Sequence, residues 1–167
     1  MSQNEISNRK ISNHANIFII DDEELVAAVL KLYLEKGGYE NLHVFTDSIE
    51  AMETLAYVKA DVILTDVDMP ELSGKFLTKL ARKTEHLENT PIIVVTSDDC
   101  ELTRKKLLGN GVDAILYKPV DCDQLLETVA RTIKNRMKES LSDATTATNT
   151  KARMIEKEQE LRQAFNR

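Results

Sequence analysis

Five short apolar segments, separated by stretches with helical spacing, constrain the fold of this 167-residue chain more than any other feature. The segments are 16–20, 41–46, 61–65, 92–96 and 112–117. The segment 41–46 alternates between apolar and polar residues, whereas the others are almost continuously apolar. Continuous apolar strands are typical of a sheet that is covered on both faces. Five alternations of strand and helix therefore predict an α/β fold, with a five-stranded parallel sheet between two layers of helices.

The first two predicted helices have clear start or stop signals. The helix after 16–20 has the sequence EELVAAVLKLYLEK and ends at Gly37-Gly38. Ser48 is the expected N-cap of the second helix, which runs to about Val58. The apolar residues of the first helix form a wide stripe that we expect to face the core: Leu25, Val26, Val29, Leu30, Leu32 and Tyr33.

Three more helices are expected along the rest of the alternating region. One runs from about Ser73 to Lys83, and another covers 101–108 and ends at Gly109. Asp121 is the expected cap of the last helix, because its side chain can accept hydrogen bonds from the first amides. The apolar stripe of that helix is Leu126, Val129, Ile133 and Met137.

The composition changes on both sides of this region. Residues 1–14 are rich in Ser and Asn, which predicts a flexible arm, and 15–140 are expected to form one domain. The Thr-rich segment 141–150 is a poor helix former and is predicted to be a linker. Residues 151–167 are charged and helix-prone, with a partial stripe of Met154, Ile155, Leu161 and Phe165. We expect this last helix to lead to an output domain or to make a homodimer contact.

Charge and cysteine content exclude several classes of function. The net charge of −6 argues against direct nucleic-acid binding. Cys100 and Cys122 have neither a CxxC partner nor a nearby His, so neither a zinc site nor a disulfide is predicted. No apolar run approaches the length needed to cross a bilayer, and the N-terminus lacks a signal-peptide pattern. These features predict a cytoplasmic protein that does not contact the membrane.

Polar residues end four of the predicted strands. They are Asp21-Asp22, Asp66, Thr96-Ser97 and Lys118-Pro119. Each is common by itself, since Asp and Ser often cap helices and Lys-Pro is an ordinary turn. The carboxyl ends of parallel strands, however, meet at one edge of the sheet, where open α/β folds bind ligands. The joint occurrence therefore predicts a site.

Carboxylates that share a sheet edge need a cation, and hard oxygen ligands favour Mg²⁺. A lysine and a hydroxyl at the same edge suit an anion beside the metal. An anion, Mg²⁺ and a carboxylate together predict phosphoryl transfer onto Asp66 as the nucleophile.

The motifs IIDDEE, LTDVDMPELSG, VVTSDD and LYKPVD together resemble the receiver domain of two-component response regulators. The resemblance covers about 16–137. It implies a CheY-like, doubly wound flavodoxin-like sheet with strand order 2-1-3-4-5. It also implies that a sensor histidine kinase or a histidine phosphotransfer protein supplies the phosphoryl group. The domain would then act as a signalling module whose only chemistry is self-phosphorylation and self-dephosphorylation.

The same resemblance implies roles for individual positions. Asp66 would accept the phosphoryl group, and Asp22 would bind Mg²⁺ directly while Asp21 assists through water. The backbone carbonyl of Asp68 would complete the metal ligands. Lys118 and the hydroxyls of Thr96 and Ser97 would face the phosphoryl group, and Thr96 would report phosphorylation to the rest of the domain. Gly74 and Pro119 would be structural, with Pro119 following a cis peptide bond.

Two departures from the family pattern affect the switch. Ile115 stands where the family usually has an aromatic residue that moves with the threonine, and Tyr117 is a partial substitute on the same strand. We therefore expect backbone shifts in the fourth helix to carry the signal. Asp68 and Asp98 occupy positions that tune phosphoryl lifetime in the family, and we expect them to change the hydrolysis rate.

Two other functions are open to the sequence. The motif DVDMP also fits the D-x-D opening of haloacid-dehalogenase-type phosphatases, but in that family the acidic Mg²⁺ pair follows the nucleophile instead of preceding it. A receiver-like interaction module that works without phosphorylation is the second alternative. The intact acids, Thr96 and Lys118 argue against it, whereas Ile115 is consistent with it.

The sequence says least about the domain or partner on which the C-terminal helix acts. The segment EKEQELRQAFNR resembles the first helix of EAL-type cyclic-di-GMP phosphodiesterases, which would place a catalytic domain beyond Arg167. The alternative is that this helix dimerises. No DNA-binding helix-turn-helix pattern is present.

Overall fold

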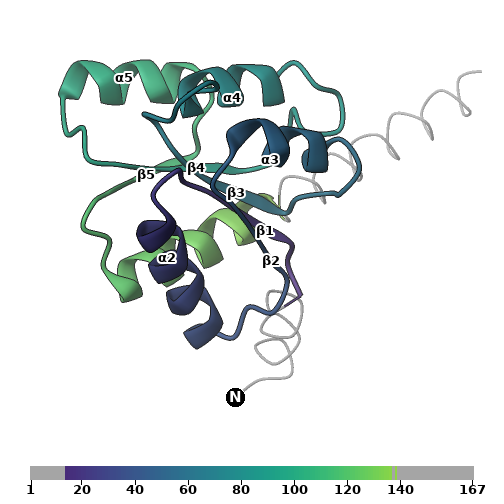
Figure 1. The fold of residues 1–167 in the computed structure, drawn as a ribbon, viewed down its shortest axis with the longest axis vertical. Coiled ribbons are helices and arrows are strands. Elements are labelled where there is room, and N and C mark those ends of the chain that lie inside the picture. Colours follow the sequence, from purple (N-terminus) through teal and green to yellow (C-terminus); the bar gives the residue numbers. More distant parts are fainter. Residues whose placement is uncertain (1–13, 137, 139–167) are drawn as a thin grey trace, which may run out of the picture. The chain divides into compact units, whose positions relative to one another are not determined.

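The computed structural model describes residues 14–136 and 138. Its centre is a five-stranded parallel sheet in the order β2-β1-β3-β4-β5 (Figure 1), which confirms the predicted fold class. The strands are β1 (Ile17–Ile20), β2 (Leu42–Phe45), β3 (Val62–Asp66), β4 (Ile92–Thr96) and β5 (Ala114–Tyr117). Each lies within the segment predicted for it or extends it by one residue, because continuous apolar runs bounded by polar residues are strong strand signals.

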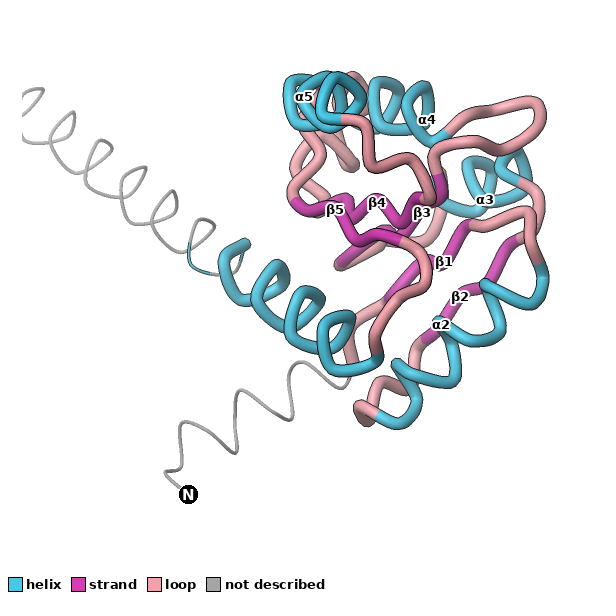
Figure 2. Tube along the Cα trace, turned by 90° about the vertical axis from the view of Figure 1, so that its left-hand side faces the viewer, coloured by secondary structure: helices cyan, strands magenta, loops and turns pink. Residues whose placement is uncertain are grey.

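Helices cover both faces of the sheet. The labelled helices are α2 (Glu24–Lys36), α3 (Ser48–Leu55), α4 (Gly74–Ala81) and α5 (Glu101–Gly109), and residues 122–136 are also helical. Helices α3, α4 and α5 lie on one face, while α2 and the helix starting at residue 122 lie on the other (Figures 1 and 2). The sheet is therefore the middle layer of three, as the sequence predicted.

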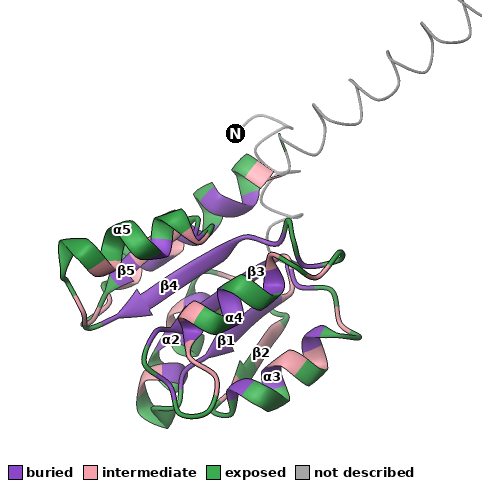
Figure 3. Cartoon of the chain, turned by 90° about the horizontal axis from the view of Figure 1, so that it is seen from above, coloured by how far each residue is buried: buried purple, intermediate pink, exposed green. Residues whose placement is uncertain are grey.

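The core follows from this layering. Every residue of β1, β3 and β4 is buried, whereas the edge strands β2 and β5 are partly exposed (Figure 3). Alternate residues of a strand point to opposite faces, so Ile17 and Ile19 pack with α2, while Phe18 and Ile20 pack with α3 and α4. Phe18 also stacks on His43, with ring centroids 4.7 Å apart.

The predicted stripe of α2 is only half correct. Leu30 is buried and Val26 and Tyr33 pack against the core. In contrast, Leu25, Leu32 and Val29 are 78%, 60% and 37% exposed. The remaining core contacts of α2 come from Ala27 and Leu34. The helix therefore turns its small Ala27 to the sheet and leaves one row of larger residues outside.

Two other boundaries differ from the predictions. The N-cap of α3 is Asp47, whose Oδ1 accepts hydrogen bonds from the amides of Ile49 (2.7 Å) and Glu50 (3.1 Å). Ser48 is instead the first helical residue and is buried. The helix ends at Leu55, short of Val58. Either polar residue can cap, and Asp47 does so because it precedes the first turn in an extended conformation.

The helix that begins at residue 122 has its predicted cap. Asp121 Oδ1 accepts a hydrogen bond from the Gln124 amide at 2.9 Å. Val129 and Ile133 are buried as expected, but Leu125 is more deeply buried than Leu126, which packs at the margin of the core. Met137 lies outside the described residues.

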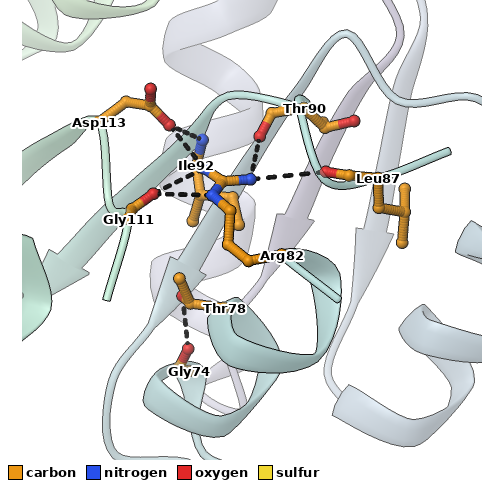
Figure 4. Close-up of polar contacts among 8 residues, drawn as sticks. All are labelled: Gly74, Thr78, Arg82, Leu87, Thr90, Ile92, Gly111 and Asp113. Carbon is orange, nitrogen blue, oxygen red and sulfur yellow. Dashed lines mark hydrogen bonds and ion pairs between the residues drawn. The ribbon is translucent and has the colours of Figure 1, made fainter. Parts of the chain in front are cut away.

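Arg82, the residue after α4, ties together three segments at the amino ends of β4 and β5 (Figure 4). Its guanidinium donates to the carbonyl oxygens of Gly111 (2.6 and 3.0 Å) and Thr90 (2.7 Å), and it forms an ion pair with Asp113 (2.8 Å). Asp113 in turn accepts the Ile92 amide at 2.8 Å. This network connects the segments that lead into β4 and β5, at the end of the sheet opposite the carboxyl ends of the strands.

Several predictions fall beyond this part of the chain. The predicted arm (except His14), the linker 141–150 and the helix 151–167 lie outside the described residues. The compact unit that contains the sheet ends at Ile133. None of the helices that the structure describes is long and apolar enough to cross a membrane. Cys100 is exposed and Cys122 half-buried, and both are free thiols.

Candidate functional site

Three aspartates meet where β1 and β3 end. Asp66 is the last residue of β3, and Asp21 and Asp22 follow β1, which pairs directly with β3. Carboxylate oxygens of Asp21, Asp22 and Asp66 lie within 4.8 Å of one another. Asp21 and Asp66 are buried, with exposed fractions of 1% and 7%, whereas Asp22 faces solvent. Chain order reverses between β1 and β3, so this is the switch point at which such sheets bind ligands.

Lys118 reaches the cluster from the end of β5 and contacts three carboxylates. Its Nζ lies 2.9 Å from Asp21 Oδ2, 3.2 Å from Glu23 Oε1 and 3.6 Å from Asp66 Oδ2. The lysine side chain is only 12% exposed. The lysine was predicted at this edge, but its contact with Glu23 was not. A glutamate at the start of a helix does not indicate, from the sequence alone, that its side chain contacts a lysine from another strand end.

The electrostatics reflect crowding of like charges in a partly buried space. Burial raises the pKa of Asp21, with the charge of Asp66 adding to the effect, against the opposing hydrogen bonds from Lys118 and the Glu23 amide. Burial would lower the pKa of Lys118, but its hydrogen bond and charge interaction with Asp21, helped by Asp66 and Glu23, raise that pKa above the ordinary value. The site therefore carries more negative charge than one ammonium balances.

Thr96 ends β4 beside this cluster and is buried. Its hydroxyl oxygen accepts a hydrogen bond from the Asp98 amide at 3.1 Å, and Asp98 Oδ1 accepts one from the Cys100 amide at 2.9 Å. The Cys100 amide, together with the Thr103 side chain and the nearby charge of Lys75, lowers the pKa of Asp98. Two consecutive side-chain turns thus connect Thr96 to Cys100, the N-cap residue of α5. Ser97 is exposed.

The two residues at the departure from the family pattern face different surroundings. Ile115 packs against a small cluster under α5 that contains Val67, Val94 and Leu107. Tyr117 is the register partner of Thr96 across β4 and β5 and is 36% exposed. Ile115 on β5 therefore packs against a cluster that includes both Val67, the residue after Asp66, and Leu107 of α5.

The loop after Asp66 folds back closely on it. The Gly74 amide donates to the Val67 carbonyl at 3.0 Å, and a Cβ at Gly74 would overlap the Asp66 carbonyl oxygen. The resemblance implied a structural role for Gly74, and the close approach to the Asp66 carbonyl is a physical reason for a glycine at this position. Asp68 is exposed on this loop. The Lys118–Pro119 peptide bond is cis, as the resemblance implied.

The fold and this site define a class of protein, and comparison with known proteins names it. The family model of the response regulator receiver domain matches residues 17–130. The chain therefore belongs to the response regulator receiver family, and it carries a two-component signalling domain.

Curated relatives include whole regulators and parts of kinases. The chain is 31% identical over 131 residues to the CAI-1 autoinducer sensor kinase/phosphatase CqsS of Vibrio cholerae, covering 78% of this chain and 19% of that protein. It thus spans about a fifth of that relative. It is 27% identical over 114 residues to the polar-differentiation response regulator DivK of Brucella anthropi, covering 68% of this chain and 92% of DivK.

Solved receiver domains have the same fold. The chemotaxis response regulator CheY4 of Vibrio cholerae is 27% identical, with a TM-score of 0.67 over 71% of this chain and 98% of its own. The receiver domain of the sensor histidine kinase PA1611 from Pseudomonas aeruginosa is 26% identical, with a TM-score of 0.67 over 72% of this chain and 98% of its own. That structure has a magnesium ion coordinated in the active-site cleft.

The residues present fit a divalent cation. Oxygen atoms of three carboxylates lie close enough together that they could hold one metal ion, and Asp21 Oδ2 is buried with Lys118 as its charge partner. Oxygen ligands with one solvent-facing carboxylate are the donor set that Mg²⁺ prefers, since it keeps several of its waters. Receiver domains bind Mg²⁺ in such an acidic pocket.

Proposed function

We propose that Asp66 accepts a phosphoryl group from a phosphohistidine on a sensor histidine kinase or a histidine phosphotransfer protein. The observation that carries this proposal is the position of Asp66, which is held at the end of a central strand between two further aspartates and Lys118. Receiver domains of sensor kinases among the relatives support a kinase as the partner.

In the transfer, an Asp66 carboxylate oxygen forms a bond to phosphorus while the P–N bond of the donor breaks. The imidazole leaves with the electron pair and takes a proton from solvent. Mg²⁺ would be held by Asp21, Asp22, Asp66 and the Asp68 carbonyl. Its positive charge would offset the negative charge of the phosphoryl oxygens. Lys118 would pair with one phosphoryl oxygen, and Thr96 or Ser97 would donate to another.

The phosphorylated state would be transmitted from Thr96 to α5. The Thr96 hydroxyl now accepts the Asp98 amide, so moving it to the phosphoryl group loosens the turns that end at Cys100. Ile115 packs against the cluster that contains Leu107 of α5 and Val67. A shift of this helix would therefore also change the packing around Val67, the residue after Asp66. Signalling through α5 needs no aromatic switch. Asp68 and Asp98 would set the phosphoryl lifetime through their charge.

The domain organisation extends this proposal. Residues 15–140 would form the receiver, and 141–150 would link it to the helix 151–167. That helix would pass the signal to an EAL-type phosphodiesterase or to a second copy of the chain. A receiver-like module that works without phosphorylation is the second candidate, and Ile115 in place of the aromatic residue is the observation that favours it.

Intact mass after incubation with acetyl phosphate and Mg²⁺ tests the phosphoryl acceptor. We expect the wild type to gain one phosphoryl group, and Asp66→Asn to gain none, because an amide is not a nucleophile here. Asp99→Asn is the matched control, since Asp99 is exposed and loses the same charge. We expect it to gain the phosphoryl group as the wild type does.

An adduct on Asp66→Asn would place the acceptor elsewhere. No adduct on the wild type, together with no binding of beryllofluoride, would favour the phosphorylation-independent module. Beryllofluoride binding without a detectable adduct would instead support a receiver whose phosphoryl group hydrolyses quickly.

A further inference from the structure

Glu23 contacts the Lys118 ammonium from outside the cluster of three aspartates. Its Oε1 lies 3.2 Å from Lys118 Nζ, between the distances to Asp21 (2.9 Å) and Asp66 (3.6 Å). Glu23 is the N-cap residue of α2, yet its side chain makes no hydrogen bond to that helix. Its carboxylate is therefore directed to Lys118 instead of capping the α2 amides.

The partners of Lys118 differ in how far they are exposed to solvent. Asp21 is buried, and its Oδ1 is held by the Glu23 amide at 3.0 Å. The side chain of Glu23 is 64% exposed, so it can follow the ammonium toward solvent. Lys118 thus bridges two buried carboxylates and an exposed one.

A divalent cation and the Lys118 ammonium compete for the same carboxylates. If Mg²⁺ binds beside Asp21, two positive charges stand close together unless the ammonium moves away. Moving the half-buried ammonium away without another partner is unfavourable, because leaving a largely desolvated charge unpaired is costly. Glu23 is placed to be that partner.

We propose that Glu23 is a positioning residue that accepts the Lys118 ammonium when Mg²⁺ takes the place of the ammonium beside Asp21. Glu23 thereby strengthens Mg²⁺ binding and keeps Lys118 next to Asp66 for an incoming anion. This inference rests on the proposed function, since it assumes that the three aspartates bind Mg²⁺.

Titration of Mg²⁺ alone into the full chain, followed by isothermal calorimetry, tests the inference. We expect Glu23→Gln to weaken Mg²⁺ binding about three- to tenfold, because Lys118 then stays with Asp21 and Asp66. Glu24→Gln is the matched control. Glu24 is the next residue, is exposed and loses the same charge, so screening should limit its effect to less than about twofold.

A second pair of variants tests whether Glu23 acts through the lysine. In a Lys118→Met background, we expect Glu23→Gln to change Mg²⁺ affinity no more than Glu24→Gln does. An equal effect of Glu23→Gln with and without Lys118 would mean a general charge effect and would overturn the inference. Metal-free thermal unfolding completes the test, because weaker binding that comes only with a lowered Tm would also overturn it.

The outcomes separate this inference from the proposed function. A wild type that binds no Mg²⁺ would overturn both. A wild type that binds Mg²⁺, with Glu23→Gln and Glu24→Gln equal in affinity, would overturn the role of Glu23 alone.

Discussion

Gly74, the first residue of α4, lies against the backbone of Asp66. Its amide donates to the Val67 carbonyl at 3.0 Å, and its carbonyl accepts the Thr78 hydroxyl at 2.8 Å. These hydrogen bonds hold the end of the loop that follows Asp66 against the start of that loop and against α4. The position of the Asp66 carboxylate therefore depends on the absence of a side chain eight residues later.

We predict that Gly74→Ala lowers the free energy of unfolding by about 1–3 kcal/mol, because the added Cβ overlaps the Asp66 carbonyl and forces the backbone apart. Urea unfolding measures this change. Gly109→Ala is the control, since a Cβ there meets no atom within 4 Å. We expect the control to be neutral or to stabilise by up to about 1 kcal/mol, because alanine is the better helix former. Equal effects of the two changes would contradict the close-approach argument.

At the scale of the element, α2 shows that a helical stripe can be wider than the surface that it buries. Leu30 is 2% exposed and Leu32, two residues later, is 60% exposed. Both belong to the apolar stripe in the sequence. The exposed row of Leu25, Val29 and Leu32 runs along the outer side of the helix, away from the residues that pack on the sheet.

We predict that Leu30→Ala lowers the free energy of unfolding by about 2–5 kcal/mol, because it leaves a cavity between α2 and the sheet. Leu32→Ala, with the same change in side chain, should cost less than about 0.5 kcal/mol, since it removes few buried contacts. Chemical denaturation of both variants decides the matter. A cost for Leu32→Ala close to that for Leu30→Ala would mean that this row is buried in the protein in solution.

At the scale of the whole molecule, the two ends of the sheet are held by different means. The carboxyl ends carry the acidic cluster, in which like charges stand close together and Lys118 offsets part of their charge. The amino ends of β4 and β5 are held by Arg82, whose side chain is 21% exposed and which donates to the Thr90 and Gly111 carbonyls at 2.7 and 2.6 Å. Crowded like charges at one end of the sheet are thus combined with a hydrogen-bonded network at the other.

We predict that Arg82→Met lowers the free energy of unfolding by about 1.5–3 kcal/mol, because it leaves the carbonyls of Thr90 and Gly111 without their charged donor. Arg104→Met is the control, since Arg104 forms an exposed ion pair with Glu101 at 3.7 Å and should change stability by less than about 1 kcal/mol. Thermal unfolding of both proteins at high and low salt tests this. If high salt removed the Arg82 effect, the network would be a surface ion pair and no more.

Much of the fold and site could be predicted because the signals are local. Apolar runs that end in Asp66, Thr96 or Lys118 indicate both the strand and the edge at which it ends. The N-cap of α3 was misplaced by one residue, since Asp47 and Ser48 are both good caps and only the backbone conformation separates them. Such a choice depends on how the strand before it enters the helix.

The sequence by itself determined the alternation of strands and helices, the coverage of the sheet on both faces and the meeting of the acids at one edge. These follow from periodicity and turn chemistry, which act over a few residues. Only the tertiary structure decided which row of α2 is buried and which carboxylates share Lys118. Glu23 and Lys118 are 95 residues apart in the chain, and their contact depends on how α2 packs on the sheet. No local pattern in the sequence predicts this contact, because the distance between Glu23 and Lys118 depends on how all the intervening elements pack together.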